Sequence, residues 1–225
     1  MTRMLTVGAE PLRESMRTLV RGFGSDAREV ELVVNNLVDA NLTGHDSHGV
    51  GMLPRYSESF LEGGLVPNAH VKAVLDAGAM LRLDGQAGFG QVVGHEAMLM
   101  GIERAKKHGT CIMALGNAHH LCRIGAWAEM AVAAGMISIH FVNVISRGSV
   151  SVVAQGKARV AHNKGEKFPP GRLIDHQGNP TEDPRYVVVP PIGAILPFGE
   201  HKGSGLALVC ELLGGALAAG RAWHD

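Results

Sequence analysis

The sequence of 225 residues has no excess of charge of either sign, with 21 Lys and Arg against 21 Asp and Glu. This balance excludes the basic electrostatic footprint of a protein that binds nucleic acid or an anionic membrane surface. Aromatic residues are also scarce, at 4% of the chain, whereas glycine is abundant, with 30 residues. Such a composition predicts many tight turns and close approaches between backbone segments.

Cysteines and long apolar runs are few as well. The three cysteines, Cys111, Cys122 and Cys210, are odd in number and widely spaced, which predicts reduced thiols rather than a disulfide framework. The most apolar stretches, 130–146 and 206–220, are interrupted by polar residues and fall short of the ~20 apolar residues of a membrane span. The N-terminus has no apolar segment typical of a secretory signal. We therefore expect a cytoplasmic protein that neither spans a membrane nor binds nucleic acid.

Hydrophobic periodicity predicts helices in the first part of the chain and an alternation of strands and helices after Pro67. Ser25 is the expected N-cap of the second helix. The predicted helices cover about 12–23, 25–44, 53–60, 92–107, 124–134 and 204–219, and the predicted strands cover 71–75, 80–83, 111–115, 137–142 and 192–196. The proline-rich stretch 167–191 is expected to be mostly loop. The order of these elements indicates the α/β class.

One glycine-rich motif, Gly88-Phe89-Gly90-Gln91-Val92-Val93-Gly94, lies between a predicted strand and a predicted helix. The dinucleotide-binding fingerprint of a Rossmann fold needs its third glycine at position 93, which is valine. The next strand, 111–116, carries no acidic residue that could hold a ribose. We interpret this motif as a structural turn.

A second glycine-rich motif, His201-Lys202-Gly203-Ser204-Gly205, precedes the last predicted helix. Glycines before a helix let backbone N–H groups face an anion, and Lys202 adds a positive charge. The order of residues differs from that of a P-loop, so nucleotide hydrolysis is not implied. A phosphate site and a plain glycine-rich connection both fit this pattern.

Histidine is unusually frequent, with 12 residues. Ser47 and His48 are adjacent in a polar loop and could form part of a proton relay oriented by Asp46. His45 and His48 could instead ligate a metal, or these side chains could simply be solvated or cap the loop. His119 and His120 follow a predicted strand, at the edge where open α/β sheets bind ligands, and an imidazole there suits acid/base chemistry near neutral pH. The remaining histidines outside the 201–205 motif are interpreted as surface or packing residues: His70, His95, His108, His140, His162, His176 and His224.

Several motifs in this order resemble the malate/L-lactate dehydrogenase family, a group of non-Rossmann NAD(P)-dependent oxidoreductases, and within it the hydroxycarboxylate dehydrogenase branch. The motifs are Gly44-His45-Asp46-Ser47-His48-Gly49-Val50, Leu53-Pro54-Arg55-Tyr56, Asp84-Gly85, Gly88-Phe89-Gly90-Gln91, Asn117 with His120, and His201-Lys202-Gly203-Ser204-Gly205-Leu206-Ala207. The resemblance extends over nearly the whole chain.

The resemblance implies a homodimer with a mostly antiparallel or mixed sheet flanked by helices, plus a helical N-terminal domain. The helical domain is expected over 1–68, completed by the C-terminal helix 204–225. The cofactor-binding α/β domain is expected over 69–203, with 157–191 as a small helix–loop excursion.

The implied activity is the interconversion of small 2-hydroxy acids and 2-oxo acids by hydride transfer with NAD or NADP. By matching position, His120 is the general acid/base, and Ser47 and His48 belong to the relay or to the substrate-side loop. The implied cofactor contacts are Arg123, Gly125, Asn143, Val144, His201, Lys202 and Gly203. The resemblance implies no metal.

The sequence also departs from the family pattern. Met52 stands where many members carry an Arg that contacts the substrate carboxylate, so Arg55 and Arg123 are the candidates for that role. Cys122 stands where glycine is usual, and the family has a few dozen more residues between Val144 and Ser151. Two alternatives therefore stay open: a catalytically inactive or truncated member acting as a dimeric binding module, and a metal hydrolase with histidine ligands.

Overall fold

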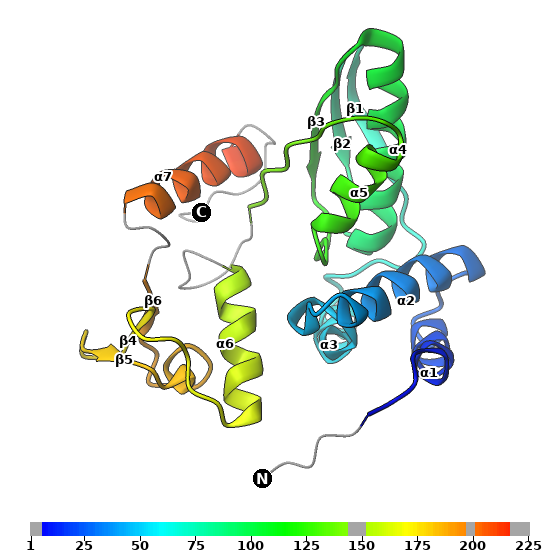
Figure 1. Cartoon of the computed structure of the whole chain (residues 1–225). Coiled ribbons are helices and arrows are strands. Elements are labelled where there is room, and N and C mark those ends of the chain that lie inside the picture. Colours follow the sequence, from blue (N-terminus) through cyan, green and yellow to red (C-terminus); the bar gives the residue numbers. More distant parts are fainter. Residues whose placement is uncertain (1–5, 144–151, 197–200, 217–225) are drawn as a thin grey trace. The chain divides into compact units, whose positions relative to one another are not determined.

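The structure is a computed structural model that describes residues 6–143, 152–196 and 201–216. These residues fall into two compact units, Thr6–His140 and the described residues from Phe141 onward (Figure 1). Each unit has buried hydrophobic residues of its own. None of the helices in the described ranges is long and apolar enough to cross a membrane.

The first unit begins with helices. Helix α1 (Ala9–Arg21) packs on α2 (Ala27–Leu42), and two short 3-10 helices, η1 (Asp46–His48) and η2 (Val50–Met52), lead into α3 (Leu53–Leu61).

The N-cap of α2 is Asp26, whose carboxylate accepts a hydrogen bond from the Glu29 backbone N–H at 2.7 Å. The prediction of Ser25 as the cap was wrong by one residue, because the Ser25 hydroxyl donates instead to the Glu29 side chain. The carboxylate of Asp26 satisfies one of the free N–H groups at the helix start.

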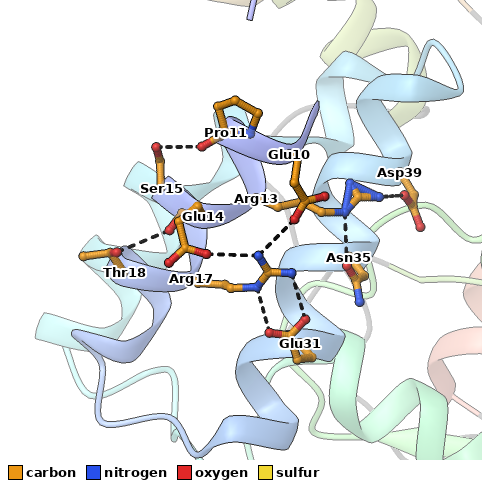
Figure 2. A network of polar contacts seen from close by, with 10 residues as sticks. All are labelled: Glu10, Pro11, Arg13, Glu14, Ser15, Arg17, Thr18, Glu31, Asn35 and Asp39. Carbon is orange, nitrogen blue, oxygen red and sulfur yellow. Dashed lines mark hydrogen bonds and ion pairs between the residues drawn. The ribbon is translucent and has the colours of Figure 1, made fainter. Parts of the chain in front are cut away.

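A polar network joins α1 to α2 (Figure 2). Arg17 donates to Glu31 at 2.8 Å and also contacts Glu10 and Glu14. Arg13 pairs with Asp39 in the same way. Because these carboxylates are largely exposed, each pair contributes little to the free energy of unfolding, and the buried apolar face of the two helices is the main source of their stability.

A three-stranded sheet follows, in the order β1 (Lys72–Ala77), β2 (Met80–Asp84), β3 (Ile112–Gly116). Strands β1 and β2 are antiparallel, and β2 and β3 are parallel. Helix α4 (Gly90–His108) connects the parallel pair, and α5 (Gly125–Ala133) follows β3. The expected mixed α/β architecture is therefore confirmed.

Apolar residues of the sheet and of α5 pack on α4. Leu81 and Leu83 of β2 pack with Ala97 of α4, while Trp127 of α5 packs with Met98 on another side of α4. Helix α4 thus packs on both the sheet and α5, and its N-terminus lies against the loop that follows β3.

The second unit contains α6 (Val152–Lys164) and a small antiparallel sheet in the order β5 (Pro180–Thr181), β4 (Leu173–Ile174), β6 (Ala194–Ile195). A 3-10 helix, η3 (Pro184–Val187), packs on α6. Helix α7 (His201–Val209) continues into a π-helix, η4 (Cys210–Ala216). The last helix therefore begins three residues before its predicted start.

One predicted strand is absent from the described structure. Residues 137–142 form no strand, although their apolar alternation predicts one. A strand needs a neighbour for its N–H and C=O groups, and within the described ranges this segment has no sheet partner.

The N-terminal helices share one core with Phe89, Val92 and Cys122 of the sheet-bearing region. The predicted domain boundary near residue 68 stays a prediction.

Candidate functional site

The candidate site lies where β2 and β3 end. The turn after β3 begins at Asn117, which has a left-handed φ of +49°. The carboxylate of Asp84 accepts from the Asn117 side-chain amide at 2.8 Å and from the Gln86 backbone N–H at 2.7 Å. The backbone N–H of His119 donates to the Gly88 carbonyl at 3.0 Å. These bonds tie together the loops that follow the two strands, and they hold His119 and His120 at this edge of the sheet.

Gly90 explains the glycine-rich motif. A Cβ at this position would lie 2.1 Å from the His120 carbonyl oxygen and 2.7 Å from that of His119. Only a glycine permits this approach between the start of α4 and the histidine turn. The motif is therefore a structural contact that positions His120, in agreement with its interpretation as a turn.

The polar loop between α2 and α3 reaches the same place. Ser47 and His48 lie on η1, with the Ser47 hydroxyl 2.9 Å from His48 Nδ1. The His48 ring stacks on that of His120, with centroids 5.4 Å apart and planes at 23°. The Asp46 carboxylate, which was expected to orient this pair, accepts from the Asn41 amide at 2.7 Å instead. The tertiary structure thus brings together all three residues predicted to be catalytic.

A buried polar network supports His120 from behind. The Tyr56 hydroxyl lies 3.0 Å from His120 Nδ1 and 3.1 Å from Cys122 Sγ. The Gln91 amide donates to the Tyr56 hydroxyl oxygen at 3.0 Å and to Cys122 Sγ at 2.9 Å. Tyr56, Gln91 and Cys122 are each at most 2% exposed.

These three residues have no catalytic role predicted from the sequence. One signal was present for Tyr56, because it lies on the apolar face of a predicted helix with Leu53 and Phe60. A tyrosine hydroxyl on a buried face needs a hydrogen-bond partner.

The environment of the site keeps its histidines neutral. Burial, together with the charges of His48, His119 and Arg55, lowers the pKa of His120 from 6.5 to about 4. Burial and His45 lower the pKa of His48, and burial and Arg55 lower that of His119. At neutral pH the His120 imidazole is therefore uncharged and able to accept a proton.

Burial has the opposite effect on the two acids of the network. It raises the pKa of Tyr56, and the neighbouring Cys122 raises it further. Burial likewise raises the pKa of the Cys122 thiol to about 11. Both groups therefore keep their protons at neutral pH and act as neutral hydrogen-bonding groups.

Two of the predicted cofactor contacts, Arg123 and Gly125, lie at the start of α5. Helix α5 begins at Gly125, which is exposed, and no side chain caps its first N–H groups. Free N–H groups at a helix N-terminus attract anions. Arg123 lies directly before this helix, where its guanidinium makes a two-pronged ion pair with Glu129, with both distances at 2.7 Å. This ion pair occupies the guanidinium, and the Ala126 and Trp127 N–H groups already donate to the Arg123 and Ile124 carbonyls, so Arg123 and Gly125 stay predicted cofactor contacts.

The other predicted cofactor contacts belong to the second unit. Asn143 directly precedes the first gap in the described chain, and Val144 lies outside the described residues. His201, Lys202 and Gly203 occupy the first turn of α7, so their backbone lies at a helix N-terminus.

The two candidates for binding a substrate carboxylate differ in environment. Arg55 is exposed on α3, and its charge acts on both His119 and His120. Arg123 is already paired with Glu129. Of the two, Arg55 is therefore the better placed to attract an anionic substrate toward the histidines.

A metal site needs several His, Cys, Asp or Glu side chains grouped around one point. Across the part of the chain that the structure describes, no three His, Cys, Asp or Glu side chains are grouped so that they could hold a metal ion. The alternative of a histidine-ligated hydrolase therefore gains no support from this geometry.

Comparisons with known proteins agree on one family. The model of the malate/L-lactate dehydrogenase family matches residues 7–150 and 147–225. Hydroxycarboxylate dehydrogenase B of Escherichia coli K12 is 43% identical over 250 residues, which cover 96% of this chain and 69% of the relative. L-lactate dehydrogenase of Cupriavidus necator is 38% identical, covering 84% of this chain and 64% of the relative. The crystal structure of a dehydrogenase from Sinorhizobium meliloti has a TM-score of 0.85 at 29% identity, covering 99% of this chain and 74% of that one.

The same comparisons locate a difference in length. The alignment of 250 residues with the E. coli relative is longer than this chain of 225, so the relative has residues with no counterpart here. The two matches to the family model meet at residues 147–150. The family's additional residues are expected at this same place, between Val144 and Ser151.

Proposed function

The chain belongs to the malate/L-lactate dehydrogenase family, and on this premise we propose that it is a nicotinamide-dependent dehydrogenase that interconverts small 2-hydroxy acids and 2-oxo acids. The observation that carries the proposal is the convergence of Ser47, His48 and His120 beside the buried Tyr56. Bound NAD or NADP would supply the hydride acceptor or donor. The protein must then manage the proton of the substrate oxygen.

We assign that proton to His120. Its Nδ1 is engaged by Tyr56, which leaves Nε2 as the nitrogen for the substrate. Because the low pKa of about 4 keeps the ring neutral, Nε2 can accept the hydroxyl proton as a 2-hydroxy acid is oxidised. In the reverse direction the protonated ring returns this proton to the carbonyl oxygen of a 2-oxo acid.

Ser47 and His48 act beside His120 in this proposal. The rings of His48 and His120 meet face to face, so a proton would pass between them only through a bridging group such as water. The Ser47 hydroxyl, bonded to His48 Nδ1, can donate or accept. This pair fits either a relay to solvent or contacts to the bound substrate, and Arg55 would attract the substrate carboxylate.

The first test is a screen of 2-oxo acids against NADH and NADPH, followed by absorbance. We expect oxidation of at least one reduced cofactor, and the screen identifies both the cofactor and the acid. The inactive binding-module alternative would be favoured by no turnover together with no change in NAD(P)H fluorescence on titration. Stoichiometric zinc in the purified protein would favour a metal hydrolase instead.

The second test removes the base. His120→Asn should lower kcat by about 10²- to 10⁴-fold, the usual contribution of a general acid/base, while NADH or NADPH still binds. The matched control is His108→Asn, on an exposed residue at the end of α4, which should leave kcat unchanged. Turnover retained by His120→Asn would remove His120 from the mechanism.

The homodimer and the cofactor contacts remain part of the proposal. Light scattering of the purified protein tests the expected dimer. Arg123→Gln should raise the dissociation constant for the cofactor and leave the His120 environment intact, because the Arg123 side chain is paired with Glu129 outside the buried network.

A further inference from the structure

The loop that carries Ser47 and His48 is joined to α2 by the side chain of Asn41, in the last turn of that helix. The Asn41 amide N–H donates to the Asp46 carboxylate at 2.7 Å, and its amide oxygen accepts from the Val50 backbone N–H at 2.9 Å. Asp46 begins η1 and Val50 begins η2. One amide therefore holds both ends of the segment that contains Ser47 and His48.

Gly49 gives this amide its place. A Cβ at position 49 would lie 2.0 Å from Asn41 Oδ1 and 2.7 Å from Asn41 Nδ2, far inside the about 3.5–4.0 Å of an ordinary van der Waals contact. The φ of Gly49 is −89°, which does not by itself require glycine, so the requirement is steric. The glycine that directly follows His48 is what lets the Asn41 amide reach across the loop.

The segment held in this way reaches the candidate base. The His48 ring stacks on the His120 ring with centroids 5.4 Å apart, and the Ser47 hydroxyl lies 2.9 Å from His48 Nδ1. Groups at a reaction centre need a fixed position, because a misplacement of about 1 Å can cost about 10²-fold in rate. The Asn41 amide supplies such a constraint from outside the reaction centre.

We propose that Asn41 is a positioning residue that holds Ser47 and His48 against His120, with Gly49 making room for its amide. The consequence for the reaction rate rests on the proposed function, whereas the consequence for the loop geometry does not. Without the amide contacts, the loop loses the bonds at both of its ends, and His48 moves away from the face of the His120 ring.

This movement has a signature in the His120 ring. Burial, His48, His119 and Arg55 together lower the pKa of His120 to about 4. When His48 moves away, the His120 ring loses part of its burial and the repulsion from one neighbouring cation, so its pKa rises toward the ordinary value of about 6.5. A side chain that only stabilises the folded protein would change the unfolding midpoint and leave this pKa unchanged.

The first test displaces the amide without changing Asn41. Gly49→Ala places a Cβ where the amide lies, and Gly51→Ala is the matched control, because a Cβ there would meet no described atom within 4 Å. The His120 ring is followed by ¹⁵N NMR of histidine-labelled protein between pH 8 and pH 5, and His120→Asn identifies its resonances. We expect the ring to gain a proton in this range in Gly49→Ala, and to stay neutral in Gly51→Ala and in the unsubstituted protein.

The second test exchanges donor and acceptor. Asn41→Asp keeps the oxygen that accepts from Val50, but it sets two carboxylates against each other at the contact with Asp46. The double variant Asn41→Asp with Asp46→Asn restores this hydrogen bond in the reverse direction and has the net charge of the unsubstituted protein. We expect the His120 pKa to rise in Asn41→Asp and to return in the double variant. Asn35→Asp, at an exposed position of the same helix, controls for the added charge.

Kinetics provide the second readout. For the 2-hydroxy acid found in the screen, kcat/KM should fall about tenfold or more in Gly49→Ala and in Asn41→Asp, and the double variant should recover most of it. Gly51→Ala and Asn35→Asp should match the unsubstituted protein.

A His120 ring that stays neutral down to pH 5 in both Gly49→Ala and Asn41→Asp would overturn the proposal. A double variant no closer to the unsubstituted protein than Asn41→Asp would do the same. If the urea midpoint of these variants falls while the His120 pKa and kcat/KM stay unchanged, Asn41 only stabilises the fold, which also contradicts the proposal.

The two proposals fail in different ways. A protein without dehydrogenase activity whose His120 pKa responds as expected would refute the proposed function and leave the role of Asn41 intact. An active protein whose His120 pKa and kcat/KM ignore these substitutions would do the reverse.

Discussion

His120 owes its chemistry to the groups that surround it. Burial beside His48, His119 and Arg55 makes a positive charge on this ring unfavourable, and the pKa falls to about 4. Tyr56 occupies Nδ1, so that Nε2 is the nitrogen left for chemistry. A histidine in this environment is a base at neutral pH, and it becomes an acid only after it has accepted the substrate proton.

The pH dependence of the two directions should therefore differ. Between pH 5 and pH 8 we expect kcat/KM for oxidation of a 2-hydroxy acid to be nearly flat, because the ring is already neutral in the free protein. Over the same range kcat/KM for reduction of a 2-oxo acid should fall about tenfold per pH unit, because the protonated fraction of a group with a pKa near 4 falls in that proportion. Initial rates in both directions measure this, and a midpoint near pH 6.5 would contradict the lowered pKa.

At the scale of elements, α4 links the sheet to the catalytic turn. Its first turn approaches the His119 and His120 carbonyls through Gly90, and its middle carries Gly101, where a Cβ would meet Met113 atoms at an ordinary 3.5 Å. The same helix thus contains one glycine that the site requires and one that it does not.

Substituting the two glycines should give opposite results. Gly90→Ala places a Cβ against the His120 carbonyl and should lower the free energy of unfolding by about 1–3 kcal/mol, typical of overpacking, with a loss of activity. Gly101→Ala should raise it by about 0.5–1 kcal/mol, the usual advantage of alanine over glycine inside a helix, with activity unchanged. Urea unfolding and kcat of both variants test this. Equal stability of the two variants would show that the turn moves away without cost.

At the scale of the whole molecule, the buried histidines connect the site to stability. His48, His119 and His120 all have pKa values lowered by burial. For His120 the unfolded chain, with a pKa near 6.5, binds a proton between pH 6.5 and pH 4, where the folded protein does not. Acidification in this window therefore favours unfolding.

We expect the urea midpoint to fall as the pH is lowered from 7 to 4. Protonation of His120 in the unfolded chain lowers the free energy of unfolding progressively through this window. From the size of the pKa change, this loss amounts to at most about 3 kcal/mol. His120→Asn should show a shallower fall, and the control His108→Asn should follow the unsubstituted protein. A midpoint that rises on acidification would mean that these rings are stabilised as cations.

Local patterns in the sequence determined most elements and the identity of the candidate base. The periodicity of apolar residues placed α4 and β3 within a few residues of their bounds, because a helix or strand depends mainly on near neighbours in the chain. The position after β3 indicated the pair His119 and His120, and the resemblance carried by the order of the motifs then selected His120.

Only the tertiary structure decided how the candidate base is held. The contacts of Cys122 with Gln91 and with the His48 carbonyl join residues 31 and 74 positions apart in the chain, and no local pattern encodes such distances. The same holds for Gly90, whose necessity appears only when α4 meets the His120 carbonyl, and for residues 137–142, whose apolar alternation finds no sheet partner in the described ranges. A sequence specifies the preference of each segment, but contacts between distant segments exist only once the chain has packed, because packing alone determines which groups share a buried space.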